Sequence, residues 1–176
     1  MNNLELRMYG LVNYNISPIQ QGIQFGHAVV EYGQKMKYLG EHKQSLNTQY
    51  NDWADNYKTF IILNGGTTNN KIKDGVYLGS LNNHKETLDK IGIFNDVFNE
   101  PDLGDQLTSV VFIVDERVFN KVKYPNFEFQ QRNQIDFNNP IFFDEKEKKD
   151  WEQWVDLIGG RKNLELRNFL VNFRLA

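Results

Sequence analysis

The sequence predicts an α/β fold, with a mixed central sheet, helices on both of its faces and a C-terminal helical extension. Two features favour this class. Apolar runs of strand length alternate with segments whose apolar residues recur every three or four positions. The last part of the chain has no clear strand pattern and ends in two helical patterns. We therefore expect an α/β domain over residues 1–124, and an aromatic-rich segment with two helices packed on it over residues 125–176.

The first predicted elements are a strand and a helix. Residues 6–13 alternate loosely and carry aromatic and branched side chains, as strands do. Ser17 is a suitable N-cap and Pro18 fits the first helical position, so a helix begins there. Gly22 and Gly26 lie one turn apart inside it, and close packing or the approach of a ligand would explain them.

The middle of the chain predicts a second strand and a hairpin. A short helix is expected near residues 51–56. Residues 58–63 (KTFIIL) form a continuous apolar run that fits a central, buried strand. A turn-rich segment follows over residues 64–70. Asp74 and Gly75 predict a hairpin turn.

The next helix is expected to have Ser80 as its cap and Gly92 as its terminator. Residues 94–98 and 108–115 are predicted strands. Residues 126–143 have the composition of an irregular segment anchored by aromatic side chains.

Two helices close the chain. Asp144 starts one that carries a tryptophan stripe and stops at Gly159 and Gly160. The stripe, Trp151 and Trp154, favours core or oligomer contact over a stacking platform. The last helix is expected over residues 163–175.

Composition limits the function. The 176 residues are 40% hydrophobic and 24% charged, and the net charge is −3. An acidic balance disfavours a protein that mainly coats nucleic-acid backbone. The chain has no cysteine, which excludes disulfides and Cys-type zinc sites. It shows neither a signal-peptide pattern nor an apolar run of membrane-spanning length, so we expect a soluble, cytoplasmic protein without metal or other cofactor.

The first candidate site is the start of the first helix. Its free N–H groups and positive dipole end would receive a phosphate, while Gln20, Gln21 and Gln24 would read a base or ribose. His27 follows within the same helix and is a candidate general base. The alternative is a polar first turn with a structural histidine in the core.

The second candidate site is the turn after the apolar run. Ligands gather beyond the carboxyl ends of strands in open α/β sheets, and successive N–H groups around two glycines form an anion nest. No P-loop lysine follows, and the alternative is a plain surface turn. The predicted ligand-binding residues are Asn64, Gly65, Gly66, Thr67, Thr68 and Asn69.

The third candidate site joins Glu100 and Asp102 with Thr108 just after them. Paired carboxylates do acid/base work or bind metals, but metal binding is disfavoured because no histidine accompanies them. A two-histidine phosphodiesterase site would need His27 and His84 to converge. The predicted catalytic set is therefore His27, His84, Asp102 and Thr108.

Read together, these segments resemble the peptidyl-tRNA hydrolase type 2 family. That family opens its first helix with Lys-hydrophobic-Ala-Ala-Gln-x-x-His-Ala, and residues 20–28 (QQGIQFGHA) match this opening. Its Asp-Ala-Gly-x-Thr loop resembles Asp102-Leu103-Gly104. The other matches are Trp53, residues 59–63, residues 81–91 and residues 110–114. The resemblance covers about residues 6–116 and implies a three-layer sandwich.

This chain departs from the family at three points. Gln20 stands where the family has lysine, so the cation expected to meet tRNA is missing. The loop lacks the family threonine, for which Thr108 is a substitute, and the Gly65–Thr68 turn is an addition. The resemblance implies a cleft that once bound the 3′ end of a tRNA. Without the lysine, this cleft is expected to bind a smaller nucleotide.

The chain also resembles small proteins of a tailed-phage branch of that family, which implies an anti-defence role in the host cytoplasm. The leading hypothesis is a protein that sequesters or cleaves a small signalling nucleotide, either a cyclic oligonucleotide or an ADP-ribose derivative. The alternative is a peptidyl-tRNA hydrolase that uses Gln24 and Asp102, with tRNA as partner. A third is a protein-binding module acting through residues 126–176. We expect a homodimer or higher homo-oligomer and no membrane partner.

Overall fold

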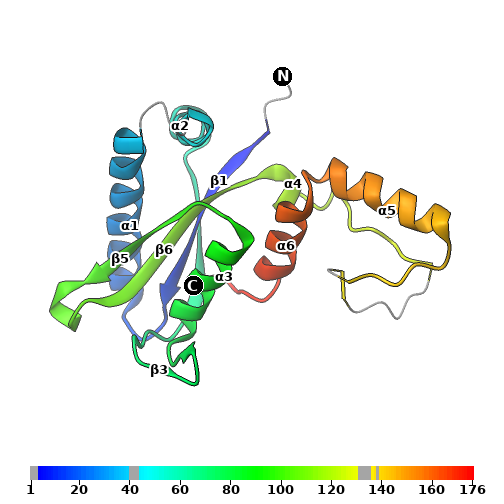
Figure 1. Ribbon diagram of the computed structural model, residues 1–176. Coiled ribbons are helices and arrows are strands. Elements are labelled where there is room, and N and C mark those ends of the chain that lie inside the picture. The colour runs from blue at the N-terminus through cyan, green and yellow to red at the C-terminus, as the bar shows by residue number, and fades with distance from the viewer. Residues whose placement is uncertain (1–3, 40–43, 131–135, 138) are drawn as a thin grey trace.

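A computed structural model describes residues 4–39, 44–130, 136–137 and 139–176. Its centre is a four-stranded mixed sheet (Figure 1). β1 (Leu6–Asn13) pairs in parallel with β2 (Thr59–Gly66) and antiparallel with β6 (Gln106–Asp115). β5 (Asn95–Glu100) pairs antiparallel with β6, which gives the strand order β2-β1-β6-β5. The predicted α/β class with a mixed sheet is confirmed.

Helices cover both faces of the sheet (Figure 1). On one face, α1 (Pro18–Leu39), α2 (Gln44–Asp52) and the π-helical turn Trp53–Tyr57 enclose a core built on Met8, Phe25 and Tyr32. On the other face lie α3 (Ser80–Ile91), the short α4 (Glu116–Phe119) and α6 (Arg161–Leu170). The core of this second face is built on Leu11, Leu88, Phe112 and Phe169.

The prediction that residues 58–63 form a central strand is wrong. Residues 59–63 belong to β2, which is at the edge of the sheet and continues through Gly66, so the expected turn residues 64–66 are part of the strand. The run is apolar because β2, though an edge strand, contributes side chains to both cores, such as Leu63 and Ile62.

The free edge of β2 is partly occupied by the end of the chain. The Asn64 N–H donates to the Arg174 carbonyl, and the Ala176 N–H donates to the Ile62 carbonyl. For this reason α6 ends at Leu170, five residues before the predicted boundary. The residues after it leave the helix in order to pair with β2.

The hairpin and the helix starts follow local sequence signals. Asp74 and Gly75 both have positive φ, 52° and 79°, in the turn between β3 (Ile72–Lys73) and β4 (Val76–Tyr77), as predicted. Ser80, by contrast, is the first residue of α3 and not its cap, since Gly79 holds the cap position. The Thr67 hydroxyl accepts the Ser80 N–H at 3.3 Å.

The C-terminal part of the chain forms a lobe of its own (Figure 1). Its helix α5 (Glu145–Leu157) has Asp144 as N-cap, as expected. The aromatic-rich segment packs on α5 around Phe129, Trp151 and Leu164. We call the described part of residues 126–158, which ends before α6, the C-terminal lobe. Trp151 is buried in it, so its expected role as a core residue is confirmed.

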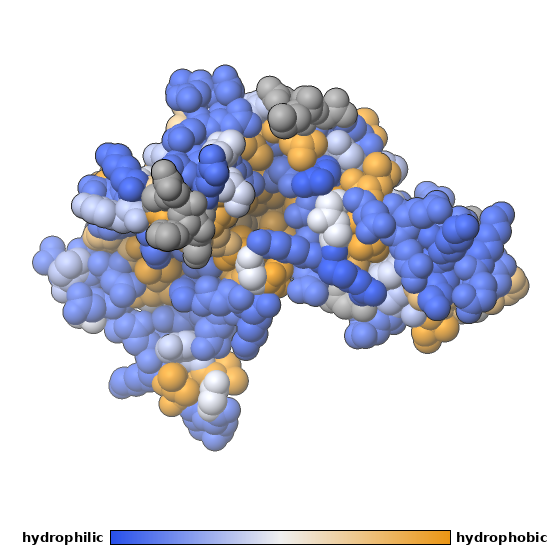
Figure 2. Space-filling model, turned by 45° about the horizontal axis from the view of Figure 1, so that its top comes forward, coloured by the Kyte–Doolittle hydropathy of each residue, from blue (hydrophilic) through white to orange (hydrophobic). Residues whose placement is uncertain are grey.

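Most of the surface in Figure 2 is hydrophilic, and apolar residues gather in the hollow between the C-terminal lobe and the sheet and on the β3–β4 hairpin. The exposed apolar residues of that hairpin region are Ile72, Val76 and Leu78. Among the described residues, no helix has the length and apolar character needed to cross a membrane.

Candidate functional site

Three polar side chains connect α1 to the β5–β6 hairpin. The Gln24 side chain is buried, accepts a hydrogen bond from the Thr108 hydroxyl at 2.7 Å and donates one to the Glu100 carboxylate at 2.5 Å. We call Gln24, Thr108 and Glu100 the α1–β5 network. Glu100 is held in place by Gln24. The sequence analysis paired it with Asp102 in the third candidate site but left it out of the predicted catalytic set.

Thr108 reaches α1 because β6 carries a bulge. Phe98 pairs with Ser109 and Asn99 pairs with Leu107, so Thr108 faces no partner on β5. Its hydroxyl also lies 3.1 Å from the Phe98 carbonyl. With one O–H proton and two acceptors within reach, Thr108 is committed to hydrogen bonds inside the fold.

His27 is exposed on α1, and its ring lies 4.4 Å from the ring of Phe98. The alternative of a core histidine is therefore wrong. His84 lies in α3, on the opposite face of the sheet, against Phe169 and Phe173. The two histidines do not converge, because α1 and α3 are separated by the sheet.

The glutamines at the start of α1 bond to their own backbone. Ser17 N–H donates to the Gln20 side-chain oxygen at 3.0 Å, and Gln20 N–H donates to the Ser17 hydroxyl at 3.3 Å. This reciprocal pair is a capping box. The Gln21 side chain donates to the Ile16 carbonyl at 3.3 Å. Gln20 and Gln21 therefore stabilise the helix start.

The turn of the β5–β6 hairpin is acidic. It carries Glu100, Asp102 and Asp105, and residues 91–116 contain no lysine or arginine. Farther along α1, Lys35 pairs with Asp96 of β5 at 3.0 Å. Asp102 is exposed. Gly22 and Gly26 also face open space, since a side chain at either would meet nothing within 4 Å. Close packing therefore does not explain these two glycines.

The predicted anion nest supports α3. Its backbone donors at Gly66, Thr67 and Asn69 already bond, at 2.9 to 3.1 Å, to the side chains of Asn64, Ser80 and Asn82. A side chain at Gly65 would collide with Leu81. The Thr68 hydroxyl is buried and has no hydrogen-bond partner among the described residues. In this arrangement Gly66, Thr67 and Asn69 offer an anion no spare N–H group.

A polar pocket of about 460 Å³ lies between α3 and the β5–β6 hairpin and reaches Asn70, at the end of this turn. Its lysine, Lys85, forms a 2.6 Å ion pair with Asp89, which also lines the pocket. Since Glu86 is a further lining residue, the described lining is acidic on balance.

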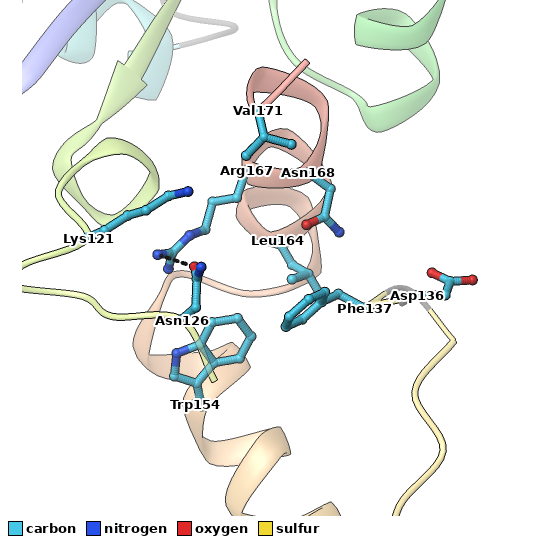
Figure 3. A pocket seen from close by; sticks show the side chains of 9 residues that line it. All are labelled: Lys121, Asn126, Asp136, Phe137, Trp154, Leu164, Arg167, Asn168 and Val171. Atoms are coloured by element: carbon cyan, nitrogen blue, oxygen red, sulfur yellow. Dashed lines mark hydrogen bonds between the residues drawn. The ribbon is translucent and has the colours of Figure 1, made fainter. Parts of the chain in front are cut away.

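A different pocket, of about 360 Å³, lies where the C-terminal lobe meets α6 (Figure 3). We call it the Arg167 pocket. Residues at i, i+3, i+4 and i+7 along α6 and just past its end form one wall, because they share one helix face. The lining residues are Lys121, Asn126, Asp136, Phe137, Trp154, Leu164, Arg167, Asn168 and Val171.

Arg167 is 4% exposed and only partly bonded. Its Nη2 donates to the Tyr124 carbonyl at 2.6 Å and to the Asn126 side-chain oxygen at 3.2 Å. Its Nε and Nη1 are buried and find no hydrogen-bond partner in the part of the chain that the structure describes. Burial lowers the pKa of this guanidinium. No acid is within ion-pair distance of it among those residues.

Aromatic rings and a second cation complete the pocket. The Arg167 guanidinium lies 5.6 Å from the ring centre of Trp154, whose indole N–H donates to the Pro125 carbonyl. Phe137 lies across the pocket, and Lys121 and Asp136 lie on opposite sides of Arg167 in Figure 3. The pocket thus offers flat apolar surface beside positive charge.

The sequence analysis placed no site residue in the Arg167 pocket, although one signal was present. Arg167 follows Leu164 at helical spacing and lies between the apolar residues Leu166 and Phe169. An arginine at a buried helix position needs an acceptor for its charge.

The comparisons with known proteins give no family for this chain. No family model, curated protein or solved structure matches it. Among the described residues, no three His, Asp or Glu side chains gather as a metal site would require.

Proposed function

We propose that this protein binds a small nucleotide, and that the ligand occupies the Arg167 pocket. A nucleotide combines a flat base with an anionic phosphate, and the pocket combines the rings of Trp154 and Phe137 with the cations Arg167 and Lys121. Base stacking on an aromatic side chain is worth about 1–3 kcal/mol. The volume of about 360 Å³ is within the ordinary range for small-molecule sites.

One observation carries the proposal: the Nε and Nη1 atoms of the buried Arg167 have no hydrogen-bond partner among the described residues. A buried charged donor without an acceptor destabilises a fold by several kcal/mol in general, so such groups are almost always paired. A phosphate oxygen supplies the missing acceptor and the missing charge. Both atoms are shielded from solvent, so a bound phosphate requires the guanidinium to turn toward it.

The same site favours sequestration over cleavage. The described lining of the pocket holds neither a histidine nor a hydroxyl side chain, and its only acid is the exposed Asp136. His27 lies on α1 and His84 against Phe169 and Phe173, and neither lines the pocket. The protein would then act by removing a signalling nucleotide from solution. An anti-defence role in phage infection rests on the resemblance alone.

A thermal-shift screen tests the proposal. We would use adenine mononucleotides, cyclic dinucleotides, ADP-ribose derivatives and deacylated tRNA, and then check the mass of each recovered ligand. A ligand at 100 times its dissociation constant adds about 2.7 kcal/mol to stability. We expect a shift with a small nucleotide that is recovered unchanged. An altered mass would indicate an enzyme instead.

Two variants localise the binding. Trp154→Leu removes the stacking surface, and we expect the shift to disappear. Gln153→Leu changes an exposed neighbour in α5 that does not line the pocket, and should retain it. Absence of a shift with every small nucleotide, or an equal shift in both variants, would overturn the proposal.

Peptidyl-tRNA hydrolysis is the second candidate, favoured by the α1–β5 network, which holds the Glu100 carboxylate on the side of α1 that carries His27. Against it stand Glu100, Asp102 and Asp105 of the β5–β6 hairpin, whose negative charges repel a phosphate backbone. The test is release of amino acid from N-blocked aminoacyl-tRNA. Hydrolase activity that is lost in the Asp102→Ala variant would support peptidyl-tRNA hydrolysis as the function.

A further inference from the structure

The β3–β4 hairpin presents two cations and two apolar side chains to solvent. Lys73 pairs with Val76 across the hairpin. The Leu78 N–H donates to the Lys71 carbonyl at 2.9 Å, so these two residues are opposite each other as well. Because side chains alternate along a strand, these four side chains lie on one face, and all four residues are exposed. We call them the hairpin face. Tyr77 points to the other face and is half-buried.

Hydrogen bonds to α3 hold the hairpin in position. The Tyr77 N–H donates to the Asn83 side-chain oxygen at 3.1 Å, and the Asn83 amide donates to the Tyr77 carbonyl at 2.7 Å. An isolated two-stranded hairpin is marginally stable in water, so these bonds give it the support it needs. The apolar residues seen on it in Figure 2 are therefore presented on a fixed support, as a binding surface requires.

An acidic turn lies beside the hairpin, at the same end of the sheet (Figure 1). At the base of the hairpin, the Asn70 N–H donates to the Gln106 side-chain oxygen at 3.2 Å, and the Asn70 amide donates to the Asp105 carbonyl at 3.1 Å. Between β5 and β6, Asp102, Leu103 and Asp105 are all exposed. We call these three residues the acidic turn. Like the hairpin face, it combines charge with an apolar side chain, but its charge has the opposite sign.

The charged groups of the two surfaces are available to a partner. Lys71, Lys73, Asp102 and Asp105 form no ion pair with any residue that the structure describes. Both surfaces lie within residues 44–130, every one of which is described. A positive half and a negative half therefore lie next to each other on one end of the molecule.

We infer that this end of the molecule is an interface for a second copy of the chain, with each hairpin face against the partner's acidic turn. A two-fold interface uses the same patch on both subunits, so the patch has to be complementary to itself. Here the lysines of one copy face the aspartates of the other, and Val76 and Leu78 face the partner's Leu103. A partner of one charge sign, such as a nucleic-acid backbone, would match only one half. The inference does not depend on nucleotide binding.

Sedimentation velocity of the full chain over a range of concentrations tests the inference. We expect a monomer–dimer equilibrium. The hairpin variant combines Lys71→Glu and Lys73→Glu, and the turn variant combines Asp102→Lys and Asp105→Asn. Asparagine is chosen because it tolerates the φ of 57° at Asp105. Each variant places like charges in contact or removes the attraction, and should raise the dissociation constant at least about tenfold.

An equimolar mixture of the two variants is the decisive measurement. The reversed hairpin of one variant then faces the reversed turn of the other, and their two unaltered surfaces also match. We expect a heterodimer with a dissociation constant within about threefold of the wild-type value. Mixing does not repair a misfolded variant, so this recovery separates charge pairing from structural damage.

The control variant combines Lys146→Glu and Lys149→Glu. It makes the same change in net charge as the hairpin variant, at exposed positions of α5. It should leave the dissociation constant unchanged.

Four results would overturn the inference. They are a wild-type chain that stays monomeric up to about 1 mM, a dimer that neither charge variant weakens, a mixture of the variants that stays monomeric, and an equal loss in the α5 control. A thermal-shift measurement with nucleotide on the same variants tests the proposed function separately, because neither surface lines the Arg167 pocket.

Discussion

The two polar clusters of this protein differ in whether their hydrogen bonds are complete. In the α1–β5 network, the Gln24 side chain uses both its oxygen and its nitrogen on partners within the fold. In the Arg167 pocket, a more deeply buried and charged group leaves two of its nitrogens unpaired within the described chain. A network whose hydrogen bonds are all made within the protein has a structural role. A buried group in a pocket whose hydrogen bonds are not all made indicates a ligand-binding site.

The largest effect is expected from the carboxylate that holds the aromatic segment in place. Glu147 is buried and accepts hydrogen bonds from the N–H groups of Gln130 and Phe143, each at 2.6 Å. Glu147→Ala leaves both donors unpaired, and we expect a loss of about 3 kcal/mol or more in urea denaturation. We also expect nucleotide binding to be lost, because this segment carries one wall of the pocket.

Glu152→Ala is the matched control for that variant. It removes the same charge from an exposed position on α5, and should change stability by no more than about 0.5 kcal/mol. Similar losses in the two variants would show that net charge, and not the two buried hydrogen bonds, determines the stability of the lobe.

An intermediate effect is expected inside the α1–β5 network. Thr108→Val keeps the shape of the side chain but leaves the buried Gln24 oxygen without its donor. We expect a loss of about 1–3 kcal/mol by thermal or chemical unfolding. Ser109→Ala is the neighbouring contrast, since the Ser109 hydroxyl is buried without a hydrogen-bond partner among the described residues. Its removal should be neutral or stabilising, and an equal loss at both positions would contradict this account.

The smallest effect is expected from pH. Burial against Phe169 and Phe173 lowers the pKa of His84 below its ordinary value of about 6.5. The unfolded chain therefore binds the proton more readily than the folded one. The contribution of His84 is constant above about pH 7, and stability falls as the pH drops below about 6.5.

Unfolding free energies measured between pH 7.5 and pH 5 check this prediction. In His84→Phe, the part of the slope that belongs to this residue should disappear. A slope that is unchanged in the variant would assign the pH dependence to other groups.

Local signals in the sequence predicted much of the fold. The bounds of β1, the Asp74-Gly75 hairpin and the Asp144 cap all agree with the structure, because each depends on neighbouring residues. The position of β2 at the edge did not follow from its apolar run. Because helices cover both faces of the sheet, an edge strand has as many apolar residues as a central one. The order of the strands therefore depends on contacts between residues distant in the chain, which apolar runs do not reveal.

The candidate site was less accessible to sequence reasoning. Gln24, Thr108 and Glu100 were each named from their residue types, but the contact of Thr108 with Gln24 depends on a bulge that alternation does not reveal. The N–H groups of Thr67 and Asn69 were expected to be free and are bonded to Ser80 and Asn82 of α3. Arg167 was overlooked because helical spacing predicts which residues share a helix face. It does not predict whether a buried charged group has a hydrogen-bond partner.

The pairing of the chain's last residues with β2 has a kinetic consequence. Leu63 and Leu175 form a β-bridge although well over half of the chain separates them. Contacts of such long range form slowly, since a long loop has to close first. We therefore expect the helix that carries Arg167 to dock late in folding, after the sheet has formed. A ligand in its pocket would act on the folded state and slow unfolding without accelerating folding.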